Sequence, residues 1–140
     1  MIKDVIVTDL DVINTPGGNV LHAIKRTDDG YNGFGEVYFS QIKFDVIKAW
    51  KKHDRMTLNI VVPLGKIRLV MFDGRNALDS RFQEIVISHD NYCRVTIPPK
   101  IWVGFQGMAA ESMLVNIANI EHDPLEVERK NIKQIDFNWR

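Results

Sequence analysis

The sequence has a single cysteine, Cys93, among its 140 residues. One thiol forms no disulfide within the chain and no zinc site by itself, so we expect Cys93 to pack as a small buried residue rather than act as a reactive group. The charge is also unbiased, because 18 Lys and Arg residues balance 18 Asp and Glu residues. A balanced chain has no bulk attraction for nucleic acid or for an anionic membrane. The sequence therefore predicts neither partner.

Long apolar runs and internal repeats are missing as well. No run approaches the roughly 18 apolar residues that suggest a transmembrane helix, and the N-terminal stretch lacks the apolar segment of a secretion signal. These features predict a cytoplasmic protein. The length suffices for one sizeable core, and no low-complexity tract or linker interrupts the chain. We therefore expect residues 1–140 to form a single domain.

Helical periodicity is scarce, whereas alternating and β-branched segments are frequent. Only Asp123–Arg129 carries helix-start signals, with Asp123 as the N-cap and Pro124 at the first helical position. Regularly spaced short strands, separated by turn signals, are typical of an antiparallel sandwich or barrel. The sequence thus predicts an all-β fold with at most a short C-terminal helix. The expected strands cover residues 35–44, 57–62, 66–72, 84–88, 93–97 and 113–120.

Polar side chains inside apolar strands are candidates for a ligand site, because a small barrel points alternate side chains inward. Glu36, Tyr38 and Ser40 have the same parity and therefore point to one face of their strand. That face either lines a cavity or is the solvated side of an antiparallel sheet, and the sequence leaves both open. Asn59 and Asn116 are neutral donors suited either to a keto oxygen or hydroxyl of a ligand or to strand-end backbone groups.

The stretch Val46–His53 changes abruptly from an apolar run to cations and one imidazole. Lysine and histidine side chains can bind anions and transfer protons if the fold places them inside the protein. In a strand Lys51 and His53 have the same parity, whereas Lys52 points the other way. The alternative is a loop of solvated charge at a strand end.

Three blocks of the chain resemble the cupin-fold enzymes that epimerise or isomerise nucleotide-linked 4-keto-6-deoxy sugars, such as the dTDP-4-dehydrorhamnose 3,5-epimerases. Residues 36–50 resemble two strands leading into an Arg-Gly-Leu-His-type motif, and residues 61–73 the hairpin that follows. Ile97-Pro-Pro-Lys-Ile-Trp-Val-Gly-Phe105 resembles the family's Ile-Pro-Pro-Gly…His-Gly-Phe segment. The resemblance implies a cupin-type jelly-roll β-barrel, a homodimer that exchanges strands, and no metal or organic cofactor.

The catalytic positions of that family are substituted in this chain. Lys51 stands where the epimerases carry their base histidine, and His53 follows two residues later. Leu58 replaces a lysine that helps hold the enolate, and Val103 replaces the histidine before the final Gly-Phe. The family's tyrosine acid falls on Val115 or an immediate neighbour.

The binding positions are better matched. Lys48 falls where the family has an arginine that contacts substrate. The positive charge is kept, but lysine cannot form the paired hydrogen bonds of a guanidinium group. Glu36 falls where the family has a nucleotide-binding glutamine. His22 and Lys25 precede the barrel, where related enzymes contact the nucleotide with an N-terminal segment, or they belong to a solvated loop. Trp102 either stacks on a base or sugar or fills the core.

The resemblance implies an epimerase or ketoisomerase that acts by cofactor-independent proton transfer through an enolate, in surface-polysaccharide sugar biosynthesis. In this interpretation His53 is the base, Lys51 or Lys48 is the partner of the oxyanion or phosphate, and Tyr38 donates a proton. A second hypothesis is a non-catalytic cupin that still binds a sugar nucleotide. A third is a structural subunit that dimerises through edge strands and has no pocket.

A metal site is not expected. Metal-dependent cupins typically present a His-X-His pair, and here Lys51 occupies the first position of that pair. The four histidines, His22, His53, His89 and His122, are widely scattered in the sequence. One imidazole alone does not form a metal site.

Overall fold

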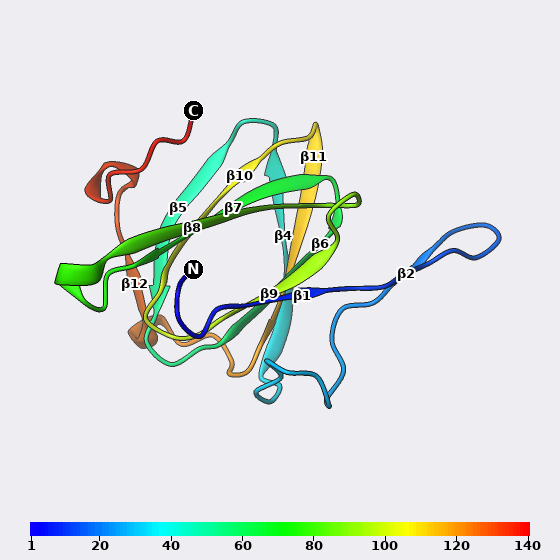
Figure 1. Ribbon diagram of the computed structural model, residues 1–140, viewed down its shortest axis with the longest axis horizontal. Coiled ribbons are helices and arrows are strands. Elements are labelled where there is room, and N and C mark those ends of the chain that lie inside the picture. The colour runs from blue at the N-terminus through cyan, green and yellow to red at the C-terminus, as the bar shows by residue number, and fades with distance from the viewer.

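The computed structural model describes residues 1–140 and consists of two five-stranded antiparallel β-sheets packed against each other (Figure 1). The first sheet has the strand order β1-β9-β6-β11-β4, and the second has the order β12-β5-β10-β7-β8. A separate two-stranded ribbon, β2–β3, projects from the body (Figure 1). The strands are β1 (Ile6–Asp9), β2 (Val12–Ile13), β3 (Val20–Leu21), β4 (Glu36–Lys43), β5 (Ile47–His53), β6 (Leu58–Leu64), β7 (Lys66–Asp73), β8 (Arg81–Ser88), β9 (Cys93–Ile97), β10 (Trp102–Gly107), β11 (Glu111–Ala118) and β12 (Val127–Arg129).

The hydrophobic core lies between the two sheets and follows the two-residue period of the strands. Alternate residues point inward, such as Leu58 and Ile60 on β6 and Leu69 and Met71 on β7. Cys93 belongs to this core and is fully buried. Burial raises the pKa of its thiol to about 11, so the expected packing role of this cysteine agrees with its environment.

A second apolar cluster joins the C-terminal tail to the second sheet. Ile135 and Trp139 pack against Trp50, with 5.3 Å between the ring centroids of Trp50 and Trp139. Gly104 permits this close approach, because a Cβ there would lie 3.1 Å from the Trp139 ring and 2.7 Å from Ala49 Cβ. The tail is thereby fixed beside β5.

The expected all-β fold with antiparallel sheets is confirmed, and its arrangement is that of a cupin-like jelly roll, although the two sheets do not close into a barrel. All six expected strands are present, and their observed ends differ from the expected ones by a few residues at most. The Asp123–Arg129 helix is limited to one 3₁₀ turn, Pro124–Glu126, which Asp123 caps by accepting a hydrogen bond from Leu125 N. Two further 3₁₀ turns span Ala77–Asp79 and Ile132–Gln134.

Five strands were not expected from the sequence, β1, β2, β3, β10 and β12, and a sixth, β5, was left open between a strand and a loop. Four of the unexpected strands are four residues or shorter, so they offer too few positions for an alternation to be recognised, and β10 contains two glycines and no exposed position. None of the helical segments is long and apolar enough to cross a membrane.

Candidate active site

A cavity of about 410 Å³ opens between the two sheets. This volume falls in the range of sites that hold small molecules, roughly 300 to 1,000 Å³. Both sheets contribute polar and apolar side chains to its walls. The lining residues are Tyr38, Ser40, Leu58, Ile60, Leu114 and Asn116 on the first sheet, and Lys48, Ala49, Trp50, Lys51, His53, Val103, Phe105, Arg129 and Lys130 on or beside the second.

Strand β5 supplies the titratable wall of the cavity. Its alternation turns Lys51 and His53 toward the cavity, whereas Lys52 forms an ion pair with Glu128 at 2.8 Å. His53 is only 5% exposed. The expected parity is therefore confirmed, and this segment is a paired strand rather than a loop of solvated charge.

A β-bulge explains why Lys48 also lines the cavity. Lys51 lies opposite Val103 and Lys48 lies opposite Phe105, so three steps along β5 match only two along β10. The extra residue shifts the alternation of β5. Lys48 and Lys51, which a regular strand would place on opposite faces, consequently reach the same cavity.

His53 is held by a buried carboxylate. Its Nδ1 donates a hydrogen bond to Oε1 of Glu126 at 2.5 Å. The other carboxylate oxygen accepts hydrogen bonds from the backbone N–H groups of Arg55 at 3.0 Å and Met56 at 3.3 Å. Because Nδ1 is engaged, Nε2 is the ring nitrogen left to act as a base toward a bound molecule.

The pKa values of this pair are both lowered. Burial lowers the pKa of His53 below its usual value, and the opposing influence of Glu126 does not restore it. For Glu126, burial raises the pKa, but hydrogen bonds from His53 and from the backbone of Arg55 and Met56 outweigh it, so its pKa is lowered. The pair at neutral pH is thus a neutral imidazole beside a carboxylate.

Tyr38 faces the same cavity from the first sheet. It lies opposite Asn116 in the β4–β11 register, and Asn116 Nδ2 donates a hydrogen bond to the tyrosine oxygen at 2.9 Å. Burial raises the pKa of Tyr38 despite this hydrogen bond. Tyr38 is therefore protonated at neutral pH and can donate a proton.

Lys51 is the half-buried ammonium group of the cavity. Burial lowers its pKa first, and the neighbouring charge of Arg129 lowers it further, against the attraction of Glu126. Lys48 differs, because its ammonium group donates to the backbone oxygen of Gln41 at 2.7 Å. With Arg129 and Lys130 from the C-terminal segment, these side chains make the wall cationic.

The cavity brings together six of the residues that the sequence singled out: Tyr38, Ser40, Lys48, Lys51, His53 and Asn116. Tyr38 and Ser40 share one face of β4, as expected, and of the two alternatives that the sequence left open for this face the structure shows the cavity. Glu36 does not line the cavity, although its Oε1 is buried without a hydrogen-bond partner.

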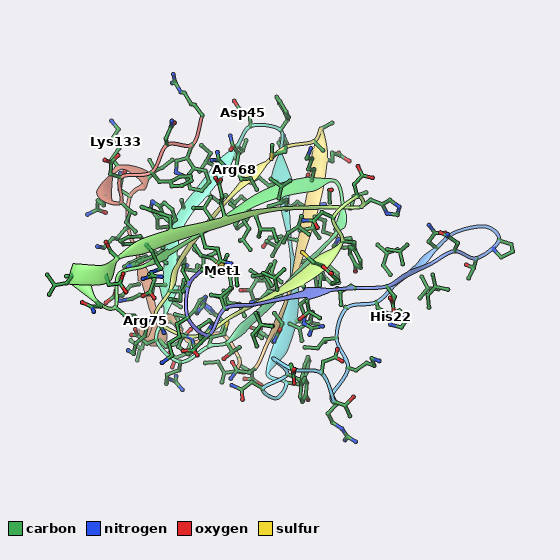
Figure 2. The ribbon with its side chains drawn as sticks, viewed as in Figure 1. Met1, His22, Asp45, Arg68, Arg75 and Lys133 are labelled. Carbon is green, nitrogen blue, oxygen red and sulfur yellow. The ribbon has the colours of Figure 1, made fainter.

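Four other candidates lie outside the cavity. Asn59 accepts a hydrogen bond from the Thr96 hydroxyl at 2.6 Å and donates to Gly30 O at 3.0 Å. Trp102 packs in the second apolar cluster. His22 and Lys25 follow the projecting β2–β3 ribbon, and His22 is far from the body's centre (Figure 2). Their substrate-binding roles stay predictions.

Three site residues, Glu126, Arg129 and Lys130, were missed by reasoning from the sequence. All three belong to the C-terminal segment, and no periodicity or motif there marks them as facing a cavity. The only usable signal was the Asp123-Pro124 helix start, which places Glu126 in a capped turn. No group of three or more His, Cys, Asp or Glu side chains is arranged to hold a metal ion.

The fold and the site define a cupin-like jelly-roll protein whose cationic cavity contains a candidate base, His53, and a candidate acid, Tyr38. No protein-family model and no curated protein matches the sequence, but solved structures do. A dTDP-sugar isomerase from Desulfovibrio desulfuricans G20 is 32% identical and superposes with a TM-score of 0.92, covering 98% of this chain and 91% of that chain. The protein therefore belongs to the family of dTDP-sugar isomerases.

More distant structures share the fold. The dTDP-6-deoxy-D-glucose 3,5-epimerase of Legionella pneumophila, in complex with dTDP-4-keto-L-rhamnose, is 14% identical with a TM-score of 0.82, over 94% of this chain and 74% of that chain. A 3,4-ketoisomerase from Thermoanaerobacterium thermosaccharolyticum, in complex with TDP-4-keto-6-deoxyglucose, is 14% identical with a TM-score of 0.78, over 93% of this chain and 90% of that chain. The scaffold thus occurs in both epimerases and ketoisomerases.

Proposed function

We propose that the protein is an epimerase or ketoisomerase of a nucleotide-linked 4-keto-6-deoxy sugar, in surface-polysaccharide sugar biosynthesis. One observation carries the proposal: a base, His53 held by Glu126, and an acid, Tyr38 held by Asn116, face one cavity from opposite sheets. A reaction that removes a proton from one position and returns it at another needs such a pair. The family to which the chain belongs supports the same kind of chemistry.

The proposed reaction begins at the carbon beside the keto group. Nε2 of His53 takes the proton from that C–H bond, and the bond's electron pair moves into an enolate. The carboxylate of Glu126, 2.5 Å from Nδ1, stabilises the imidazolium that forms. A lowered pKa suits this step, because it keeps His53 unprotonated and ready at neutral pH.

The enolate oxygen then needs a fixed positive charge. Lys51 is suited to this role because its ammonium group lines the cavity close to the base on the same strand. In an epimerisation Tyr38 donates its proton to the carbon that lost one, on the opposite face. In a ketoisomerisation Tyr38 donates it to the enolate oxygen, and the resulting enediol becomes the new ketone when its other hydroxyl loses a proton and the former carbonyl carbon takes up the proton held by His53. Lys48, Arg129 and Lys130 are suited to the diphosphate, whose oxygens favour charge-assisted hydrogen bonds. Every step uses side chains of this chain, so the proposed route is cofactor-independent.

We expect the protein to incorporate deuterium from heavy water into the carbon beside the keto group of TDP-4-keto-6-deoxyglucose. Proton exchange follows directly from reversible enolate formation and does not require knowledge of the product. The measurement is proton NMR or mass spectrometry of the recovered sugar nucleotide, with incubation without protein as the control. The absence of exchange across several nucleotide-linked keto sugars contradicts the proposal.

A non-catalytic cupin that binds a sugar nucleotide is the second candidate, and the substituted family positions Leu58 and Val103 favour it. It predicts a higher melting temperature in the presence of dTDP without any exchange, since a ligand that binds only the folded state stabilises it. A structural subunit without a pocket is the weakest reading, because polar and charged side chains line the cavity.

We also propose a homodimer with exchanged strands. The β2–β3 ribbon forms a sheet of its own and projects from the body (Figure 1), with Ile13 45% and Val20 49% exposed. On the edge strand β4, Phe39 is 64% exposed. Unpaired edges and exposed apolar side chains are the features that a second copy covers.

Light scattering is expected to give twice the mass of one chain, and Phe39→Asp is expected to shift the protein toward the monomer because it places a charge in the proposed interface. Leu78→Asp is the matched control, since Leu78 is 98% exposed on a turn far from β4 in the sequence. A monomeric parent protein, or equal behaviour of the two variants, contradicts the proposed interface.

A further inference from the structure

The hydrogen bond between Asn116 and Tyr38 has a fixed direction. An amide nitrogen donates but does not accept, so the tyrosine oxygen is the acceptor of the 2.9 Å contact with Asn116 Nδ2. The hydroxyl proton of Tyr38 must then point to another partner. Because Tyr38 lines the cavity, the open direction for that proton is the space where a substrate would bind.

A half-turn rotation of the Asn116 amide would cost it a hydrogen bond. Its Oδ1 accepts a hydrogen bond from the backbone N–H of Asn59 at 3.1 Å, and its Nδ2 also contacts Met56 Sδ at 3.8 Å. A flipped amide would set NH₂ against that N–H donor, and Asn116 is only 2% exposed, so water cannot compensate. Asn59 is itself held by the Thr96 hydroxyl at 2.6 Å.

We propose that Asn116 is a positioning residue that directs the hydroxyl proton of Tyr38 into the cavity. This inference rests on the proposed function, because the direction of the proton matters only if Tyr38 is the acid. Asn116 does not need to touch the substrate. Its role is to occupy the lone-pair side of the tyrosine oxygen, so that the O–H group is a preset donor.

The same contact acts on the acidity of Tyr38. Burial raises the pKa of Tyr38, the donor from Asn116 lowers it, and the charges of Glu36 and Glu126 raise it. The donor stabilises the phenolate that proton donation leaves behind. The other charged or titratable groups of the cavity wall are Lys48, Lys51, His53, Arg129 and Lys130.

Asn116→Asp tests the proposal with little change of shape. The carboxylate keeps an acceptor for Asn59 N–H but removes the donor to Tyr38, so the hydroxyl proton turns toward residue 116 and away from the cavity. Asn119→Asp is the matched control: Asn119 Oδ1 accepts from Thr57 N at 2.7 Å, and the replacement keeps that acceptor too.

The first readout is the titration of Tyr38, followed by NMR of protein carrying ¹³C-labelled tyrosine and assigned by comparison with Tyr38→Phe. We expect the Tyr38 titration to move to higher pH in Asn116→Asp and to stay in place in Asn119→Asp. The second readout is turnover. The kcat of Asn116→Asp is expected to fall about tenfold or more with little change of KM, and the alkaline limb of its pH profile to move upward.

An unchanged Tyr38 titration in folded Asn116→Asp overturns the proposal. Asn116→Leu removes the donor without adding a charge, and the same upward shift is expected there if the Asp variant does not fold. A shifted titration in a protein that turns over no keto sugar leaves the role of Asn116 standing and refutes the proposed function instead.

Discussion

Replacing His53 with asparagine is expected to slow proton exchange into a 4-keto sugar nucleotide by about a thousandfold, the typical contribution of a general base. The asparagine amide can still donate to Glu126, so the buried carboxylate keeps a partner while the basic Nε2 is lost. The rate of deuterium incorporation, measured by mass spectrometry under single-turnover conditions, tests this directly.

His89→Asn is the matched control, because His89 is exposed in the turn between β8 and β9. It is expected to leave exchange unchanged. Lys51 is the other group able to act as a base, since its pKa is lowered by burial and by Arg129. If His53→Asn retains exchange and only the double variant with Lys51→Ala loses it, the base is Lys51 and the assignment of His53 is wrong.

Replacing Glu126 with alanine is expected to cost about 3 kcal/mol of unfolding free energy and to lower the melting temperature by about 9 °C. The loss arises because the carboxylate accepts hydrogen bonds from two buried donors, His53 Nδ1 and the backbone N–H of Met56, and from the part-buried backbone N–H of Arg55. Without Glu126 the two buried donors are left unpaired. Urea unfolding at neutral pH measures the change.

Glu128→Ala is the control for this stability prediction, because Glu128 forms an exposed ion pair with Lys52 and exposed pairs contribute about 0 to 1 kcal/mol. Equal losses for the two variants contradict the prediction. Removal of Glu126 is also expected to lower exchange, since the imidazolium of His53 loses its counter-ion.

The same pair predicts how stability depends on pH. The pKa of Glu126 is lowered in the folded protein, so its stabilising contribution is present above the unfolded-state pKa and is lost as the pH falls through the lowered folded value. The pKa of His53 is lowered too, so the unfolded chain takes up a proton there first as the pH falls. In Glu126→Ala the part of the fall in unfolding free energy at low pH that comes from this carboxylate is expected to disappear.

The local parts of the fold and the site were predictable. Strand alternation depends only on neighbouring residues, and it correctly indicated the strands near 35–44 and 57–62 and the common face of Lys51 and His53. The same argument placed Tyr38 and Ser40 on one face. It left open whether that face met solvent or a cavity, because the answer depends on which sheet covers it.

The sequence by itself determined an all-β chain, an imidazole and a lysine on one face of a cationic strand, and a resemblance to sugar-nucleotide epimerases. The tertiary structure decided that His53 meets Glu126, 73 residues away, that Asn116 meets Tyr38, 78 residues away, and that a bulge brings Lys48 to the cavity. The physical reason is the distance along the sequence over which each feature is determined. The face to which a side chain points depends on a few neighbouring residues. The partners of that side chain on other strands and in the C-terminal segment depend on strand order and register, which a local sequence pattern does not show.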